Sequence, residues 1–196
     1  MIFIIFLLAC LSTISAQTLA SADQTTLLSI HNTARAKVFH PVTKLANPPV
    51  VWNSSLAVCA LYWATQMLKQ STPVHSSSTT MAGGATYSFT YLNVKYTCKV
   101  PPNRAFGENL GWGSPTVPFR AFVDLWVGEA PLYHTKYKNE SYTLAGVMEY
   151  GHYTQMAGRV VSSVGCGQAK NSVRIAFVCQ YFKSANLLGR NITDMW

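Results

Sequence analysis

Three ionisable side chains stand in contexts too apolar for ordinary surface residues. Glu108 lies in the glycine-rich stretch AFGENLGWG, Glu129 closes the apolar run DLWVGE, and His152 follows a glycine in GHYTQM. A carboxylate that is shielded from water needs a partner, and in a semi-apolar cleft it can act as a general base. A neutral imidazole can bind a divalent metal. The partner of Glu108, and its purpose, depend on the elements that hold these residues.

The N-terminal residues, 1–16, have the pattern of a secretory signal peptide. They contain the apolar run IFIIFLLACL and the small-residue stretch STISA, and we expect cleavage after Ala16. About 10 apolar residues are too few to cross a bilayer core, which needs about 20. No other segment is long and apolar enough, so we expect no transmembrane segment. The sequence predicts a secreted, extracellular protein whose remaining residues, 17–196, form one domain.

The cysteines and the glycosylation patterns agree with export. Cleavage would remove one of the five cysteines and leave an even number, which in an exported chain indicates two disulfides. The remaining cysteines are Cys59, Cys98, Cys166 and Cys179. Acceptor patterns for N-glycosylation occur at Asn53, Asn139 and Asn191.

The chain is basic, with a net charge of +8. Such a charge favours solubility, or attraction to acidic cell surfaces, glycans or anionic lipid. The Lys and Arg residues are scattered along the chain, and no motif for nucleic-acid recognition accompanies them. We therefore expect no nucleic-acid partner.

Hydrophobic periodicity predicts three helices. The first begins at Ser21, with Gln24 three residues later in a capping-box pattern, and extends for about four turns. The second follows the start signal NSS at Asn53. The third begins near Pro118, a favourable early-helix residue, and continues through FRAFVDLWVGEA.

The remaining segments predict a loop and a hairpin. Residues 71–104 are polar and rich in Ser and Thr, with AGGA and PPN as breakers, and predict a long loop or irregular insertion. The runs VVSSVGCGQA and VRIAFVCQYF predict two strands of a hairpin joined by KNS. Helices and strands together indicate a mixed α and β domain.

Several short stretches are too specific for ordinary filler. They are HNTAR at 31–35, VWNSSLA at 51–57, GENL at 107–110, LW followed by Glu129, GHYTQ at 151–155, VGCG at 164–167 and VCQYF at 178–182. In this order they resemble the motifs of the CAP superfamily, which comprises the cysteine-rich secretory proteins, antigen 5 and the pathogenesis-related 1 proteins. The resemblance covers nearly all of residues 17–196. It implies an α+β fold, the three-layer α-β-α sandwich of the CAP/SCP domain with a central cleft.

The resemblance also implies a set of cleft residues and a disulfide pattern. The family lines its cleft with two histidines and two glutamates, which map onto His75, Glu108, Glu129 and His152. The same mapping pairs Cys166 with Cys179 and leaves Cys59 with Cys98.

The cleft residues allow two chemical interpretations. His75 and His152 could bind Zn²⁺, with Glu108 and Glu129 in support, or the four side chains could form a satisfied hydrogen-bonded network. A bound metal and a glutamate base would permit a metal-dependent hydrolase or protease. The sequence has no HExxH or GxSxG motif and no free cysteine, and catalysis is not a general property of the family. We therefore expect no enzymatic activity.

A binding function rests on the aromatic residues Phe89, Tyr91 and Tyr96 in SFTYLNVKY. Sterol-binding CAP proteins resemble this pattern in having an aromatic, caveolin-like motif in a loop beside the cleft. Alternatively, these aromatics pack on the domain or lie in a short strand. The leading hypothesis is a binder of small apolar ligands, such as a sterol or fatty acid, or of an extracellular protein, in defence, host interaction or lipid export. A pure protein-recognition scaffold is the third possibility.

Overall fold

The computed structural model describes residues 19–103, 106–137 and 141–193. The predicted signal peptide and Asn139 lie outside these ranges. The elements follow along the chain in the order α1 (Ser21–Arg35), β1 (Val51–Trp52), α2 (Ser54–Met67), β2 (Thr86–Tyr91), β3 (Val94–Lys99), β4 (Phe106–Gly113), α3 (Phe119–Gly128), α4 (Ala130–Leu132), the π-helical turn η1 (Tyr133–Tyr137), α5 (Leu144–Ala157), β5 (Ser163–Lys170) and β6 (Ile175–Phe182).

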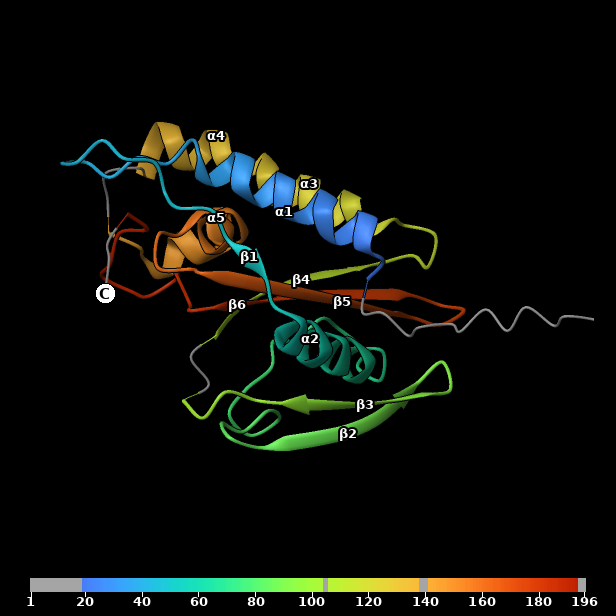
Figure 1. Cartoon of the computed structure of the whole chain (residues 1–196). Helices are drawn as coiled ribbons and strands as arrows, with labels where there is room; N and C mark the ends of the chain where they lie inside the picture. Colours follow the sequence, from blue (N-terminus) through green and yellow to red (C-terminus); the bar gives the residue numbers. More distant parts are fainter. Residues whose placement is uncertain (1–18, 104–105, 138–140, 194–196) are drawn as a thin grey trace, which may run out of the picture.

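The elements stack in layers around one central sheet (Figure 1). Helices α1, α3, α4 and α5 cover one face of the sheet, and α2 covers the other. The β2–β3 hairpin packs against the outer side of α2. This arrangement confirms the predicted α+β fold with an α-β-α sandwich, and the hairpin adds a further layer beyond α2.

The central sheet has the strand order β1-β5-β6-β4. Strand β1 pairs with β5 in parallel, and the other neighbours are antiparallel. Residues 175–181 of β6 are all buried, because helices cover both faces of the sheet. Strands β5 and β6 are the predicted C-terminal hairpin.

Both predicted disulfides are present. Cys166 lies opposite Cys179 in the register of β5 and β6, and the two are bonded. Cys59 of α2 is bonded to Cys98 of β3, so the second bridge ties the hairpin to the helix beneath it.

Helix α2 lies unusually close to β5. A Cβ atom added to Gly165 would meet the backbone nitrogen of Ala57 and the carbonyl oxygen of Asn53, and one added to Gly167 would meet the backbone of Leu61. Only glycine permits this close approach of helix to strand. The glycines of VGCG therefore set the distance between two layers.

The helix starts are partly as predicted. The N-cap of α1 is Ala20, which has no capping side chain, so the predicted capping box at Ser21 is wrong. The helix begins one residue earlier than that pattern requires, which places Ser21 within the first turn, and Gln24 donates to the carbonyl of Leu19 at 2.8 Å instead. Asn53 does cap α2, because its side-chain oxygen accepts hydrogen bonds from the backbone amides of Ser55 and Leu56. A glycan at Asn53 stays a prediction.

The prediction of a long loop or irregular insertion at 71–104 is wrong for residues 86–99, where β2 and β3 form a regular antiparallel hairpin, and the alternative of a short strand is the correct one there. Its strands alternate between half-buried and exposed residues, since one face packs on α2 and the other faces solvent. The turn uses Leu92 and Asn93, which both have positive φ angles of 48° and 63°.

Helix α5 has no counterpart among the three predicted helices. None of the helices in the described ranges is long and apolar enough to span a bilayer.

Candidate functional site

The four cleft residues implied by the resemblance meet as two histidine–glutamate pairs. His75, which follows α2, lies with its Nδ1 at 3.0 Å from Oε1 of Glu108 on β4. His152 on α5 lies with its Nδ1 at 2.7 Å from Oε1 of Glu129, which follows α3. The first pair thus joins the segment after α2 to the sheet, and the second pair joins two elements of the helical layer that contains α3 and α5.

The Glu108 carboxylate accepts hydrogen bonds from four donor groups, which are the partners that a carboxylate in apolar surroundings needs. Besides His75, its carboxylate accepts from the amide and the hydroxyl of Ser76, at 2.9 and 2.8 Å, and from Nε2 of Gln180 at 3.1 Å. The Glu108 side chain is only 6% exposed. Sequence reasoning missed Ser76 and Gln180, although Gln180 is directly opposite Glu108 once the register of β4 and β6 is known.

Glu129 binds α5 just after its non-helical residue, Tyr150. Its second oxygen accepts the backbone amide of Tyr153 at 2.9 Å, so one carboxylate fixes both a ring and the chain that carries it. The indole of Trp126 stacks on the His152 ring at a centroid distance of 5.7 Å. The orientation of His152 is therefore set from two sides.

The cleft between the pairs is a cavity of about 460 Å³. His75, Glu129 and His152 contribute to its wall, and most of the rest is apolar and aromatic, including Trp112 and Trp126. The predicted network of two histidines and two glutamates thus exists as two pairs that share a cavity.

Zinc binding at the cleft stays a prediction. Zinc sites in proteins use three or four side-chain ligands. Each carboxylate here is hydrogen-bonded to an imidazole Nδ1, so the histidine nitrogens left for a metal are Nε2 of His75 and Nε2 of His152. Across residues 19–103, 106–137 and 141–193, no three or more His, Cys, Asp or Glu side chains cluster so as to hold a metal ion.

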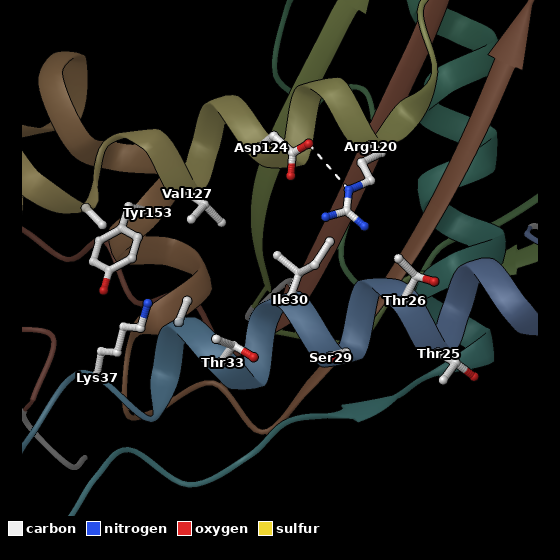
Figure 2. Close-up of a pocket in the computed structure, with 12 residues that line it drawn as sticks. Thr25, Thr26, Ser29, Ile30, Thr33, Lys37, Arg120, Asp124, Val127 and Tyr153 are labelled. Atoms are coloured by element: carbon white, nitrogen blue, oxygen red, sulfur yellow. Dashed lines mark hydrogen bonds and ion pairs between the residues drawn. The ribbon is translucent and has the colours of Figure 1, made fainter.

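A second cavity lies between α1 and α3, as Figure 2 shows, and has a volume of about 590 Å³. We call it the α1–α3 groove. Its apolar wall comes from both helices and the start of α4, namely Ile30, Ala34, Val127 and Ala130. Its polar lining consists of Thr25, Thr26, Ser29, Thr33, Lys37, Arg120, Asp124 and Tyr153.

The two ends of the groove differ in charge. Arg120 and Asp124 form an exposed ion pair with an N–O distance of 3.4 Å toward the end that contains Thr26. Lys37 and Tyr153 lie at the opposite end (Figure 2). Within the described ranges Lys37 takes part in no ion pair, so its ammonium is available to an anion.

Tyr153 adds a polar group beside Lys37. Its hydroxyl lies 2.8 Å from Nε2 of His134. Burial raises the pKa of Tyr153 to about 12, so the phenol keeps its proton at neutral pH. Sequence reasoning missed both Lys37 and Tyr153. The only signal available was their position, because Tyr153 lies within the motif GHYTQ and Lys37 lies two residues after HNTAR.

The aromatic residues predicted to bind a ligand pack on the domain instead of projecting from a mobile loop. Phe89 stacks on Tyr96 at 5.2 Å and contacts Tyr62 of α2 at 5.4 Å, both between ring centroids. The hydroxyl of Tyr91 accepts the amide of Lys170 at 3.1 Å. All three predicted residues are half-buried, which matches the packing alternative.

Of the predicted glycosylation sites, Asn139 lies outside the described residues. The side-chain oxygen of Asn191 accepts hydrogen bonds from the amide and hydroxyl of Thr193 at 3.0 and 2.9 Å. Glycosylation at both positions stays a prediction.

Comparison with known proteins places this geometry in a family. Pathogenesis-related protein 1C of Nicotiana tabacum is 28% identical over 174 residues, covering 88% of this chain and 82% of the tobacco protein. Cysteine-rich venom protein Mr30 of Conus marmoreus is 26% identical over 170 residues, covering 86% of this chain and 48% of the venom protein. The solved structure of BmVAL-1 superposes with a TM-score of 0.63 at 17% identity, covering 93% of this chain and 86% of that one, and shows the shared fold.

The model of the cysteine-rich secretory protein family, CAP, matches residues 28–181. That range includes every helix and strand from the second half of α1 to β6. Proteins of this family are generally not conventional enzymes. The chain belongs to the CAP family of cysteine-rich secretory proteins.

Proposed function

We propose that this protein binds a fatty acid or similar single-chain amphiphile in the α1–α3 groove and acts outside the cell. The observation that carries the proposal is a groove with an apolar wall and, at one end, the cation Lys37, which forms no ion pair with any described residue. Its volume of about 590 Å³ lies within the range of about 300–1,000 Å³ for small-molecule pockets.

The apolar wall supplies affinity and Lys37 supplies direction. Each buried methylene contributes about 0.8 kcal/mol, so about ten buried methylenes contribute about 8 kcal/mol before the entropic cost of association. A carboxylate at the Lys37 end would gain a charge-assisted hydrogen bond, with the Tyr153 hydroxyl as a second polar contact. At the other end Asp124 would repel it, although Arg120 offsets this charge. The ligand therefore has one preferred orientation.

The central cleft gives less support to a hydrolase. A carboxylate has about four lone-pair sites, and Glu108 already accepts four hydrogen bonds. Its lone pairs are thus already used, and the carboxylate is poorly placed to accept a further hydrogen bond from a water molecule. The Ser76 hydroxyl donates to the same carboxylate rather than to an imidazole, so the arrangement lacks the nucleophile–histidine pair of covalent hydrolases.

Extracellular action rests on the signal-like sequence of residues 1–16 and on relatives named as pathogenesis-related and venom proteins. Binding of an extracellular protein is compatible with a lipid-loaded groove, but no single surface of the described residues argues for it as strongly as the groove argues for a lipid.

The test is equilibrium binding of radiolabelled palmitate and cholesterol to the purified protein. Ile30→Gln places a polar amide in the groove wall, and we expect it to lower palmitate affinity at least tenfold. Lys37→Gln should lower it several-fold and should also weaken the salt dependence of binding. Circular dichroism and the unfolding midpoint show whether each variant is folded.

The control is the double variant Phe89→Ala/Tyr91→Ala on the hairpin, which lies on the other side of the sheet. We expect it to bind palmitate as the parent does. Loss of lipid binding in this variant, with the groove variants unaffected, would place the lipid at the hairpin. Saturable binding of neither lipid would leave protein recognition as the function.

A further inference from the structure

A third cavity, of about 320 Å³, adjoins the Lys37 end of the groove. We call it the basic basin. Its lining consists of Lys37, Val38, Phe39, His40, Pro41, Lys44, Tyr133, His134 and Thr193. Lys37 lines both the basin and the groove. Tyr153 of the groove and His134 of the basin are joined by their hydrogen bond of 2.8 Å. The two cavities therefore meet at one cationic side chain.

The basin is built from basic groups. It contains two lysines and two histidines, and none of the described residues in its lining is acidic. Neither Lys37 nor Lys44 forms an ion pair with any residue in the described ranges. The far end of the groove differs, because Arg120 is already paired with Asp124 there.

His40 and Lys44 each keep N–H groups that can donate to a ligand, because their other hydrogen bonds fix how the side chains are used. Nδ1 of His40 accepts the backbone amides of Val42 and Thr43, at 3.2 and 3.1 Å, so in the neutral ring the hydrogen is on Nε2. Nζ of Lys44 donates to the carbonyl of Pro41 at 2.6 Å, which uses one of its three N–H groups. Both side chains therefore keep N–H groups for a ligand.

The loop that carries these donors is ordered by its own backbone. The amide of His40 donates to the carbonyl of Leu45 at 2.9 Å, and Phe39 and Ala46 form an antiparallel bridge. A pre-ordered loop loses little entropy when a ligand binds, so its donors contribute more of their interaction energy to affinity.

From this juxtaposition we propose a narrower ligand class for the groove, which rests on the proposed function: a single-chain lipid whose head is a phosphate monoester. The acyl chain lies along the groove, and the phosphate enters the basin and accepts hydrogen bonds from Lys37, His40 and Lys44. A carboxylate carries one charge and is satisfied at Lys37. A phosphate monoester carries about −1.5 to −2 at neutral pH and has three strong acceptor oxygens, which match the additional donors.

The end of α1 opposes this assignment only weakly. A helix C-terminus is partially negative, with an effect of about 0.3–1 kcal/mol that falls off within the last turn. The carbonyls of Ala34 and Arg35 accept the amides of Lys37 and Val38, at 3.1 Å each, so they do not point unpaired toward the anion. The attraction of the two lysine ammonium groups for the phosphate exceeds the repulsion by the end of the helix.

The experiment measures displacement of radiolabelled palmitate by unlabelled competitors below their critical micelle concentrations. The competitors are 1-palmitoyl lysophosphatidic acid, 1-palmitoyl lysophosphatidylcholine, palmitate and glycerol 3-phosphate. We expect lysophosphatidic acid to compete at least tenfold more strongly than palmitate or lysophosphatidylcholine. Glycerol 3-phosphate, which has the phosphate without the chain, should not compete. The double variant His40→Ala/Lys44→Gln should remove the tenfold preference and change palmitate affinity by less than twofold.

Lys95→Gln is the matched control, because Lys95 is an exposed lysine on the hairpin, outside both cavities. Equal competition by lysophosphatidic acid and palmitate overturns the phosphate assignment and leaves the proposed function intact. A preference that survives in the double variant overturns it as well, because the basin is then not its source. Absence of palmitate binding contradicts the proposed function itself. Binding of lysophosphatidic acid that is unaffected by Ile30→Gln overturns the shared site.

Discussion

His31 is a fully buried imidazole whose two ring nitrogens are both hydrogen-bonded. Nδ1 lies 2.7 Å from the carbonyl of Leu27, and Nε2 lies 3.0 Å from the hydroxyl of Tyr181. A carbonyl can only accept, so Nδ1 carries the hydrogen and Nε2 accepts from Tyr181. The Tyr181 oxygen in turn accepts from Asn109, which also donates to the carbonyl of His152. This chain connects α1 to the helix that carries a cleft histidine, and it needs a neutral His31.

The stability of the protein should therefore depend on pH through His31. Burial lowers the pKa of His31 from 6.5 to about 4. The unfolded chain binds this proton at a higher pH than the folded chain, so the contribution is complete above pH 6.5 and is lost as the pH falls toward 4. We expect the free energy of unfolding to decrease by up to roughly 3 kcal/mol over this window. Urea titrations with intact disulfides, at several pH values, measure it.

The variant His31→Asn supplies the control, because it cannot titrate in this range. Its free energy of unfolding should vary less between pH 6.5 and 4 than that of the parent. NMR titration of the native protein gives a second measurement that does not require a stable variant. A His31 resonance that titrates near pH 6.5 would contradict the assignment.

Arg35 is a buried cation whose hydrogen-bond acceptors are all neutral. Its guanidinium donates to the carbonyls of Pro48, Met156, Gly158 and Val161 at 2.6–3.0 Å. Burial, followed by the charge of Arg159, lowers its pKa to about 10, so Arg35 stays charged at neutral pH. One side chain thus joins α1 to the end of α5 and to the segments before β1 and β5.

We expect Arg35→Met to reduce the free energy of unfolding by about 3–5 kcal/mol, because the carbonyls lose their donor at a fully buried position. Arg120→Met is the matched control: its exposed ion pair contributes about 0–1 kcal/mol. Denaturant unfolding of both variants measures the difference. A similar small effect for the two would show that the buried contacts of Arg35 do not stabilise the fold.

At the scale of elements, glycine positions test how tightly the layers pack. Gly165 lies where the α2 backbone approaches β5, and a Cβ there would meet backbone atoms that cannot move without shifting the helix. We expect Gly165→Ala to lower the free energy of unfolding by at least about 3 kcal/mol, in the range of severe overpacking.

Gly128, the last residue of α3, has no atom within 4 Å of an added Cβ. The same substitution there should raise the free energy of unfolding by about 0.5–1 kcal/mol, because alanine favours the helix. Thermal unfolding of the two variants provides the comparison. Destabilisation by Gly128→Ala comparable to that of Gly165→Ala would refute the packing argument.

The sequence predicted the elements whose signals are local. The three predicted helices and the last two strands have clear apolar periodicity, and Asn53 supplies a true cap. The hairpin at 86–99 was predicted only as the alternative of a short strand: aromatics alternate with Ser and Thr in TYSFTY, but the high Ser/Thr content and the flanking breakers are typical of a loop. Helix α5 was missed because it contains two glycines and a non-helical residue, Tyr150, with φ of −147°. Tertiary packing overrides propensity there.

The candidate sites differ in the same way. Glu108, Glu129 and His152 could be selected because each occupies an unusual local context, and the resemblance added His75. The α1–α3 groove could not be predicted, because it exists only where two amphipathic helices fail to close completely on each other. Helical spacing identifies the buried face of each helix but not the space left between them.

At the scale of the whole molecule, the layer order separates the groove from the hairpin. The groove belongs to the helices on one face of the sheet, and the hairpin lies beyond α2 on the other (Figure 1). A ligand that binds only the native state stabilises it by about 2.7 kcal/mol at a concentration of 100 times its Kd. A local opening that leaves the groove intact does not release the ligand. Amides that exchange through such an opening therefore gain no protection from the ligand.

Hydrogen exchange with and without saturating palmitate should therefore be regional. We expect amides of α1 and α3 to exchange up to about 100-fold more slowly with ligand, because their opening destroys the groove. For amides of β2 and β3 that exchange through local opening, the exchange rate should change by less than twofold, since that opening leaves the groove intact. The Ile30→Gln variant should lose the protection at equal palmitate. Protection confined to β2 and β3 would instead locate the lipid among the aromatic rings at Phe89 and Tyr96, on the opposite side of the sheet from the groove.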